Sequence, residues 1–385
     1  MAGYLFTFSD MDSLISCIQS GIYSTRMKTS WSIATEGTLG DFISMKPGDN
    51  VYLFSKRIVY GIGEIIELAP RLTVVENWPT STSGEAFDYA VVDPDPVLSN
   101  QPDQAKEIIQ RWIVAFRPSP YFFKTGIDMD DLLQSNPHAF RSLRVFWKRS
   151  FIKLDDEENL AFKAAILRKN LGQLNADEEV DCFECRYTQS LHEITKGNHK
   201  LSSPDIKSLL SNKRQPDGSL KSEMLLEIAL LDNLSHKSEP GSLFGQWDYL
   251  SHQVNASPMK AVDYMDKIDV FGYRWLPNYE NQIIEKYFIA ELKKGSAAIE
   301  DVFQLMKYVD WVSNEYASGD YFRLKAFLVA KSFAFESLDQ YDQAIERNQL
   351  TGRRPAKNEI WNDVTLVTYE VEADGEIVFS AFPVD

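Results

Sequence analysis

The chain has 385 residues, of which 44% are hydrophobic and 25% charged, as in ordinary globular proteins, and this length predicts two or three domains. A formal net charge of −16 argues against indiscriminate nucleic-acid binding, because such a field repels phosphate, but it leaves room for a local basic groove. The chain shows no signal-peptide pattern, no membrane-length apolar run and only three cysteines, so we expect a cytoplasmic protein without membrane contact.

The first 170 residues predict short strands and an early helix. Residues 10–21 repeat apolar side chains at helical spacing, and Gly21 ends the pattern. A helical turn is expected at Gly40–Met45, and Gly61 and Gly63 indicate a bulge or a close backbone approach. This succession predicts a small, curved mixed barrel. The expected strands are Tyr4–Phe8, Val51–Ser55, Ile58–Glu67, Phe87–Val92, Arg111–Phe116 and about Leu143–Phe151.

Ser30-Trp31-Ser32, an intervening helix and the strand pair VYLFS…GIGEI together resemble the EVE/YTH/PUA-like barrel group. The resemblance implies that residues 1–170 form a reader domain with an aromatic cage for a modified or flipped base, with Trp31 as one wall and Trp78 or Trp112 as another. Aromatic faces stabilise a stacked base by about 1–3 kcal/mol. A core role for each tryptophan remains the alternative, and so does binding of a nucleotide or a protein instead of DNA.

The middle of the chain predicts a connecting segment at 171–217. A charged amphipathic helix, Asp155–Leu171, is expected to end at Gly172, and a short helix is expected near Ser203–Ser211. Cys182 and Cys185 have C-x-x-C spacing, but no second Cys or His pair matches them, and a structural zinc site needs four ligands.

Residues 218–385 contain the constellation that carries chemistry. Two strand-like runs, Lys267–Trp275 and Lys286–Lys293, flank a turn-rich segment at Leu276–Gln282 and predict a hairpin. Glu291 and Lys293 share one face of the second run, and Asp269 in the first run can lie across from them. Two carboxylates beside an ammonium suit a divalent cation bound by oxygen ligands.

Neighbouring helices add polar residues to this constellation. The predicted helix Ser219–Asn233 carries Glu223 and Glu227 on one face, and either could be the helix carboxylate of the site. Gln304 and Tyr308 share a face of the predicted helix Ala297–Glu315, whose apolar stripe includes Phe303. Further along we expect a strand at Leu324–Ala330, a helix at Leu338–Arg347 and a hairpin formed by Val364–Val371 and Ile377–Phe379. The basic stretch Arg347–Lys357 is expected to lie near phosphate, with a solvated loop as the alternative.

The pattern Asp269…Glu291-x-Lys293…Gln304-x-x-x-Tyr308 resembles the PD-(D/E)XK nuclease superfamily, especially its RecB-like branch, over about residues 215–335; no proline precedes Asp269. The resemblance implies a multidomain α+β or α/β protein whose C-terminal α/β sandwich has a central mixed sheet. It also implies Mg²⁺ (or Mn²⁺) held by Asp269, Glu291, the Leu292 carbonyl and Glu227, with Glu223 the alternate. Lys293 would act on the attacking water, while Gln304 and Tyr308 would support Lys293 or the DNA backbone.

A base-sensing barrel joined to a nuclease resembles prokaryotic modification-dependent and antiphage nucleases, including the Shedu type. The resemblance implies an endonuclease acting on double-stranded phage or foreign DNA as a dimer or tetramer. The sequence contains no GxxxxGK[ST] motif, so we expect cleavage without NTP hydrolysis. The alternatives are a repair nuclease acting on DNA ends or branches, and a non-catalytic protein that binds nucleic acid or a partner.

Overall fold

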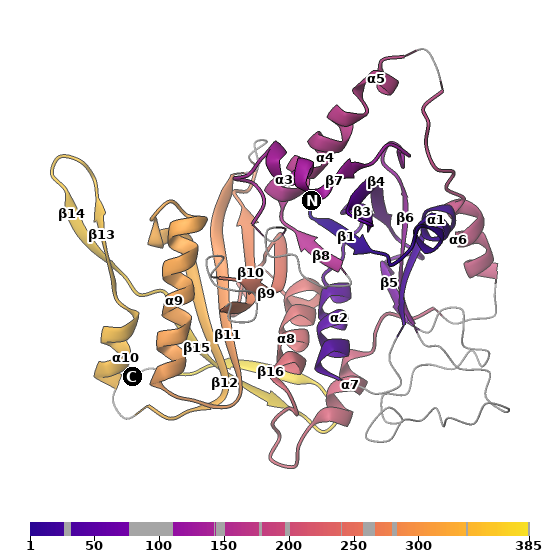
Figure 1. Cartoon of the computed structure of the whole chain (residues 1–385). Coiled ribbons are helices and arrows are strands. Elements are labelled where there is room, and N and C mark those ends of the chain that lie inside the picture. Colours follow the sequence, from indigo (N-terminus) through magenta and orange to yellow (C-terminus); the bar gives the residue numbers. More distant parts are fainter. Residues whose placement is uncertain are drawn as a thin grey trace. The chain divides into compact units, whose positions relative to one another are not determined.

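The computed structural model describes residues 1–26, 32–76, 111–141, 143, 151–176, 179–196, 201–239, 241–256, 266–278, 283–335 and 338–383. The chain divides into two compact units (Figure 1). Met1–Trp31 and Met45–Asp205 form the first unit, and Ser32–Ser44 and Ile206–Asp385 form the second. Within the described ranges, no helix is long and apolar enough to cross a membrane.

These units differ from the predicted division at 1–170, 171–217 and 218–385 in two places. Helix α2 (Ile33–Ile43) belongs to the second unit, although its neighbours in the sequence belong to the first. Most of the expected connecting segment folds into one unit or the other, because it forms helices α6 (Tyr187–Lys196) and α7 (Ile206–Lys213).

The first unit is built on a mixed sheet with the strand order β2-β6-β4-β3-β1-β8, in which β5 pairs with β6 and β7 with β4. Strands β1 and β3 are parallel and the other neighbours are antiparallel, so the mixed strand directions of the predicted barrel are confirmed, while the described strands form an open order that runs from β2 to β8. The strands are β1 (Gly3–Thr7), β2 (Ile22–Arg26), β3 (Asn50–Ser55), β4 (Ile58–Ile66), β5 (Val74–Glu76), β6 (Arg111–Pro118), β7 (Ile127–Asp128) and β8 (Phe151–Leu154).

Helix caps in the first unit follow from local sequence. Asp10 accepts from the Ser13 N–H at 2.7 Å and begins α1 (Met11–Ser20), which Gly21 ends with a positive φ of 64°. Asp155 and Glu158 form a capping box at the start of α4 (Asp156–Lys169). The remaining helices are α3 (Met129–Ser135), α5 (Leu171–Leu174) and α6.

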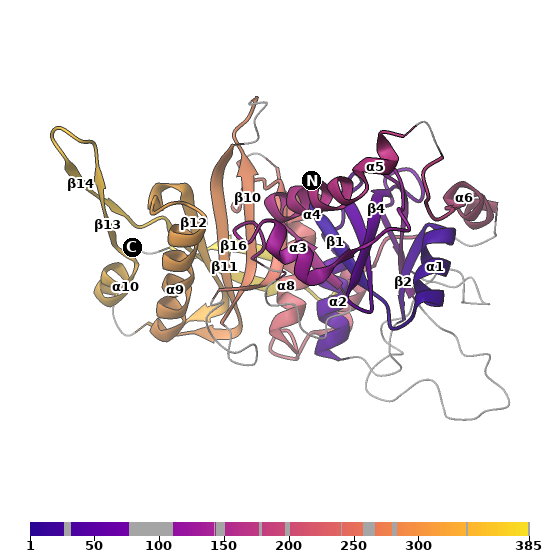
Figure 2. The ribbon, with the colours of Figure 1, turned by 45° about the horizontal axis from the view of Figure 1, so that its top comes forward.

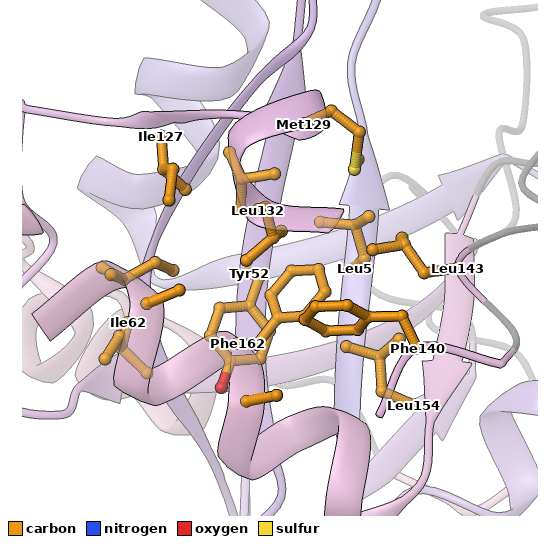
Figure 3. Packing of buried hydrophobic residues seen from close by; sticks show 14 of the residues in the cluster. Leu5, Tyr52, Ile62, Ile127, Met129, Leu132, Phe140, Leu143, Leu154 and Phe162 are labelled. Atoms are coloured by element: carbon orange, nitrogen blue, oxygen red, sulfur yellow. The ribbon is translucent and has the colours of Figure 1, made fainter. Parts of the chain in front are cut away.

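The core of the first unit is aromatic at its centre. The Tyr52 ring lies 4.8 Å from that of Phe162, which lies 5.7 Å from that of Phe140, and Leu5 and Leu154 pack around them (Figure 3). The irregularity predicted at the glycines of β4 is present as a register shift between Val51 and Tyr52, opposite Gly63 and Gly61, and a Cβ at Gly61 would stand 3.0 Å from the Tyr52 ring. Strand β3 therefore packs against α4 through these rings.

Three predictions for the first unit need correction or lie outside it. Strand β8 covers Phe151–Leu154, while most of the strand expected at about Leu143–Phe151 lies outside the described residues. The helix from Asp156 ends at Asn170, whose side chain donates to the Ile166 carbonyl at 3.0 Å, and Gly172 lies inside the next helix, α5. The strand expected at Phe87–Val92 lies outside the described residues.

The second unit contains a six-stranded mixed sheet with the order β16-β15-β12-β11-β10-β9. Helix α9 packs on β11 and β12, while α8 packs on β10 and β11 from the opposite side, with α2 against α8 (Figures 1 and 2). The elements are β9 (Tyr249–Asn255), β10 (Lys267–Trp275), β11 (Ile284–Ala297), β12 (Leu324–Phe333), β15 (Val364–Val371), β16 (Ile377–Ala381), α7, α8 (Glu223–Asp232), α9 (Ile299–Glu315) and α10 (Leu338–Ile345).

Other elements of the second unit differ from the sequence predictions. Strand β9 was not predicted, and the turn expected at Gly40–Met45 is the end of the longer helix α2. The basic stretch Arg347–Lys357, for which a solvated loop was the alternative, forms a two-stranded hairpin, β13 (Arg347–Thr351) and β14 (Lys357–Trp361). Phe303, predicted in the buried stripe of α9, is 45% exposed because it lies on the outer side of that helix.

Candidate active site

Strands β10 and β11 bring the predicted site residues together. They pair antiparallel with Val270 opposite Ala290, and one further step in this register sets Asp269 opposite Glu291. Alternation places both carboxylates on the sheet face that carries Phe271 and Tyr287. Those rings contact Tyr316 at the end of α9, so this face is the one that α9 covers.

Asp269 is held by two donors. The Leu292 N–H donates to its Oδ2 at 2.8 Å, and the Gln253 amide donates to its Oδ1 at 3.3 Å. The first bond joins the two strands at the site, and the second ties β10 to β9. Both oxygens are therefore fixed in direction before any ligand arrives.

Glu291 and Lys293 form a partly buried pair. Glu291 is 1% exposed, and its Oε1 accepts from Lys293 Nζ at 2.7 Å. Its other oxygen, Oε2, is buried, and no N–H or hydroxyl group in the described residues donates to it. Asp301, at the start of α9, lies 3.6 Å from Lys293 Nζ on the second side of the ammonium. A buried carboxylate oxygen without a donor is costly and marks a place for a cation or a proton.

Burial and mutual repulsion shift the acid–base behaviour of this group. Burial raises the pKa of Asp269 well above its usual range, and the charges of Glu291 and Glu227 raise it further. Burial also raises the pKa of Glu291 to about 7, although Lys293 opposes the shift. Burial acts to lower the pKa of Lys293, but the Glu291 carboxylate outweighs it and raises this pKa above its usual value. Lys293 is therefore an ammonium at neutral pH.

Glu227 on α8 is joined to this site through Gln253, and the charge of Glu223 on the same helix also acts on Lys293. Glu227 is 2% exposed, whereas Glu223 is exposed one turn earlier. The Gln253 amide donates to Glu227 Oε1 at 2.8 Å and also to Asp269, so a single side chain links the two carboxylates. Burial raises the pKa of Glu227.

His252 and Gln253 are site residues that the sequence predictions missed. The His252 Nδ1 lies 3.2 Å from Glu227 Oε2, and its Nε2 lies 3.0 Å from Asp41 Oδ1 on α2. Burial alone would lower the pKa of His252, but Asp41 and Glu227 outweigh it and raise this pKa to about 10. The two residues belong to β9, whose sequence YLSHQVN lacks a clean alternation. The adjacent polar residues His252 and Gln253, with apolar residues on both sides, were the sequence feature that could have indicated a site here.

Gln304 and Tyr308 also lie at this face. The Gln304 amide donates to the Tyr308 hydroxyl at 3.0 Å, and Tyr308 is buried on α9. Burial raises the pKa of Tyr308 to about 12, with the charges of Glu291 and Asp269 adding to the shift. Their influence shows that this hydroxyl lies within electrostatic reach of both carboxylates.

The donor set fits a hard cation in part. Among the described residues, no three His, Cys, Asp or Glu side chains meet the geometry of an ion-binding cluster. Asp269 and Glu291 nevertheless offer carboxylate oxygens, among them the buried Glu291 Oε2, and Leu292, the residue after Glu291, is fixed by the bond from its N–H to Asp269. Mg²⁺ typically takes one or two protein carboxylates and completes its shell with water and substrate phosphate.

The candidate base-reader residues are described only in one case. Trp31 and Trp78 lie outside the described residues. Trp112 lies on β6 and is 1% exposed, so its ring is part of the packed interior of the first unit. Packing accounts for this tryptophan without a ligand.

No family model and no curated protein matches the chain. Among solved structures it is similar to a repair endonuclease from Pyrococcus abyssi (24% identity, TM-score 0.15, covering 23% of this chain and 30% of that one). It is also similar to EndoMS in an EndoMS–dsDNA complex (24%, TM-score 0.18, 30% and 37%) and to human THYN1 in complex with DNA containing 5-methylcytosine (11%, TM-score 0.26, 43% and 98%). The chain spans about a third of the length of the two endonucleases. With TM-scores this low, none of these likenesses carries weight for fold or activity.

Proposed function

We propose that the second unit is a Mg²⁺-dependent endonuclease that hydrolyses phosphodiester bonds of double-stranded DNA. The observation that carries this proposal is the grouping of Asp269, Glu291 and Lys293 on one face of paired strands. Two buried carboxylates with raised pKa values repel each other, and a bound cation would relieve that repulsion. A solvated ion pair would account for the contact between Glu291 and Lys293. It would explain neither the burial of Glu291 nor the presence of Asp269 beside it.

The chain's own groups divide the work of such a site. Asp269, Glu291, the Leu292 carbonyl and Glu227 would hold Mg²⁺ (or Mn²⁺). When bound, the ion supplies Lewis acidity toward phosphate and lowers the pKa of water. Lys293, an ammonium held by Glu291 and Asp301, would donate a hydrogen bond to the attacking water and stabilise negative charge on the phosphate. Gln304 and Tyr308 would keep polar hydrogen-bond donors at the same face.

We propose further that this unit belongs to the RecB-like branch of the PD-(D/E)XK superfamily, on the resemblance of its motif. The first unit would be an EVE/YTH/PUA-like reader that senses a modified base or another DNA feature through Trp31 and Trp78. Such a pairing resembles prokaryotic antiphage nucleases of the Shedu type, and it favours phage or foreign DNA as the target and a homodimer or homotetramer as the active form. A repair nuclease is the second candidate in this class.

One cleavage experiment tests these proposals. The full chain is incubated with plain and base-modified DNA, each linear and circular, with Mg²⁺ or with EDTA. We expect Mg²⁺-dependent cleavage of circular DNA that Asp269→Asn and Glu291→Gln abolish while both variants stay folded. Full activity in both would refute the site. Preference for ends or branches regardless of modification would favour the repair nuclease. DNA binding without any cleavage would favour the non-catalytic alternative.

A further inference from the structure

A continuous series of polar contacts runs from helix α2 to the proposed catalytic carboxylates. Asp41 on α2 contacts His252, which contacts Glu227 on α8. Gln253 then joins Glu227 to Asp269 on β10, and Asp269 accepts from the Leu292 N–H on β11. The series thus joins five elements of the second unit.

The His252 side chain is buried and held from both sides. It is 5% exposed, and each ring nitrogen faces a carboxylate oxygen, at 3.0 Å for Asp41 and 3.2 Å for Glu227. A Cβ at Gly40 would stand 3.1 Å from the ring, so the backbone of α2 also closes off one side. A buried imidazole held in this way fixes the direction of the Glu227 carboxylate.

Gln253 occupies an unusual backbone conformation for its residue type. Its φ of 51° is left-handed, which costs a non-glycine residue of order 1 kcal/mol or more. His252 and Val270 are paired on the sheet face opposite Asp269, whereas the Gln253 amide reaches both Glu227 and Asp269. The left-handed residue therefore places one amide between the two carboxylates.

Helix α2 is held in this unit at a second point. The Ser222 hydroxyl, which caps α8, donates to Glu36 on α2 at 2.6 Å. In the sequence, however, α2 lies between β2 and β3 of the first unit, and only residues 44–49 separate it from β3. The site's supporting helix is therefore covalently tied to the strands of the proposed reader.

We propose that Asp41, His252 and Gln253 are positioning residues that hold Glu227 and Asp269 in a metal-binding arrangement, and that α2 thereby makes the nuclease site dependent on the chain's N-terminal part. The proposal rests on the nuclease function proposed above. Residues that support metal ligands typically change metal affinity or activity by about 10–100-fold when altered. Asp41 touches neither the proposed ion nor the substrate, so its effect must travel through His252.

The test is the Mg²⁺ dependence of cleavage in the full chain. We expect Asp41→Asn, which preserves the shape of the side chain but removes its charge, to raise the Mg²⁺ concentration for half-maximal cleavage about tenfold. Cleavage at saturating Mg²⁺ and the thermal unfolding midpoint should stay near the wild type. Thr38→Ala, on the same helix with a hydroxyl that donates to the Ala34 carbonyl, is the matched control and should change neither quantity.

A double-mutant cycle separates positioning from mere packing. If Asp41 acts through His252, Asp41→Asn should add nothing in the His252→Gln background, whereas independent packing effects would add. An unchanged Mg²⁺ requirement in folded Asp41→Asn, or additivity in the cycle, would overturn the inference. Failure of the wild type to cut any DNA would instead refute the nuclease function. In that case Mn²⁺ titration followed by electron paramagnetic resonance still compares metal affinity between wild type and variants, and equal affinities would overturn the positioning role.

Discussion

Lys293 keeps its charge in a half-buried place because two carboxylates flank it. Glu291 lies 2.7 Å and Asp301 3.6 Å from its Nζ, and together they compensate the burial that would otherwise favour the neutral amine. An ammonium of this kind serves as a hydrogen-bond donor and a fixed positive charge. A general base would need the opposite shift in pKa.

Replacing Lys293 should therefore remove charge stabilisation and leave DNA binding intact. We expect Lys293→Ala to reduce single-turnover cleavage by about 10²–10³-fold, the loss typical of one donor at a developing charge. Lys294→Ala is the control, because the neighbouring lysine is exposed and its Nζ donates to the Lys221 carbonyl instead. Equal cleavage by wild type and Lys293→Ala in rapid-quench measurements would contradict the role.

Asp155 provides a pH-dependent term in the stability of the first unit. Burial raises the pKa of this capping carboxyl to about 6, from an unfolded value near 4. Because the folded state binds the proton more tightly, the contribution is greatest below pH 4 and is lost as pH rises to about 6. We expect Asp155→Asn, which still caps α4, to remove a decline on the order of 1–3 kcal/mol between pH 4 and 7. Denaturant unfolding at each pH measures this loss of stability. An equal loss between pH 4 and 7 in Asp155→Asn and wild type would contradict the role of Asp155.

At the residue level the sequence predicted the part of the site that depends on spacing along one or two strands. Asp269, Glu291 and Lys293 follow from the alternation of a hairpin. Asp41 and His252 do not, because their contacts join α2 to β9, which are more than 200 residues apart in the sequence. Such pairs follow only from tertiary packing.

The β13–β14 hairpin gives its basic residues different roles according to their position along it. It projects from the six-stranded sheet (Figures 1 and 2). Arg347, at its base, binds both oxygens of Asp310 at 2.7 and 3.0 Å, so it anchors the hairpin. Arg353, Arg354 and Lys357 are exposed around its tip. In a chain of net charge −16, three exposed cations on a projecting ribbon are candidates for phosphate contact.

Removing the two arginines at the tip should weaken DNA binding without altering catalysis. We expect Arg353→Ala/Arg354→Ala to lower affinity uniformly across sequences and to reduce the slope of log K against log salt by about 2. Fluorescence anisotropy at several salt concentrations measures both quantities. The double variant Arg353→Lys/Arg354→Lys should retain most of the DNA binding, because contact with phosphate requires the positive charge more than the shape of the side chain. An unchanged slope in the alanine variant would place DNA elsewhere.

Two glycines of α2 should respond differently to the same substitution. A Cβ at Gly40 would stand 3.1 Å from the His252 ring, which carboxylates hold on both sides, so Gly40→Ala should cost about 1–3 kcal/mol of unfolding free energy. A Cβ at Gly37 would meet only the flexible end of Met224 at 3.8 Å, so Gly37→Ala should be neutral or stabilise by up to about 1 kcal/mol. Urea unfolding of both variants checks this, and equal effects would show that the His252 ring can yield.

Elements were predictable where one pattern ran without interruption. Strand β10 and the helix that became α9 follow from regular apolar spacing. Strand β9 was missed because Ser251, His252 and Gln253 break the alternation. Two of them are tolerated there because His252 contacts Glu227 and Asp41, and Gln253 donates to Glu227. The polar residues that made this strand hard to predict are the ones that contact the candidate site.

On the scale of the whole molecule, order in the sequence and membership of a unit diverge. The segment Ser32–Ser44 folds with residues from 206 onward, although residues on both of its sides fold with the first unit. A domain boundary drawn at 218 from composition cannot show this, because helix α2 looks locally like any short amphipathic element. The helix packs against α8 and β9, so the second unit includes a segment from the N-terminal part of the chain.

Cutting the chain before residue 206 removes α2 from the second unit and should therefore damage the proposed nuclease. Residues 206–385 alone lose helix α2, which packs against α8, together with the Asp41 contact to His252. We expect this fragment to melt at a lower temperature and to need more Mg²⁺ for cleavage. Joining residues 32–44 to its N-terminus through a flexible Gly/Ser linker should restore both properties, and the same fusion carrying Asp41→Asn should restore stability while leaving the Mg²⁺ requirement high. A fragment that equals the full chain without the added helix would show that α2 is dispensable, and the dependence of the site on the N-terminal part would then be lost.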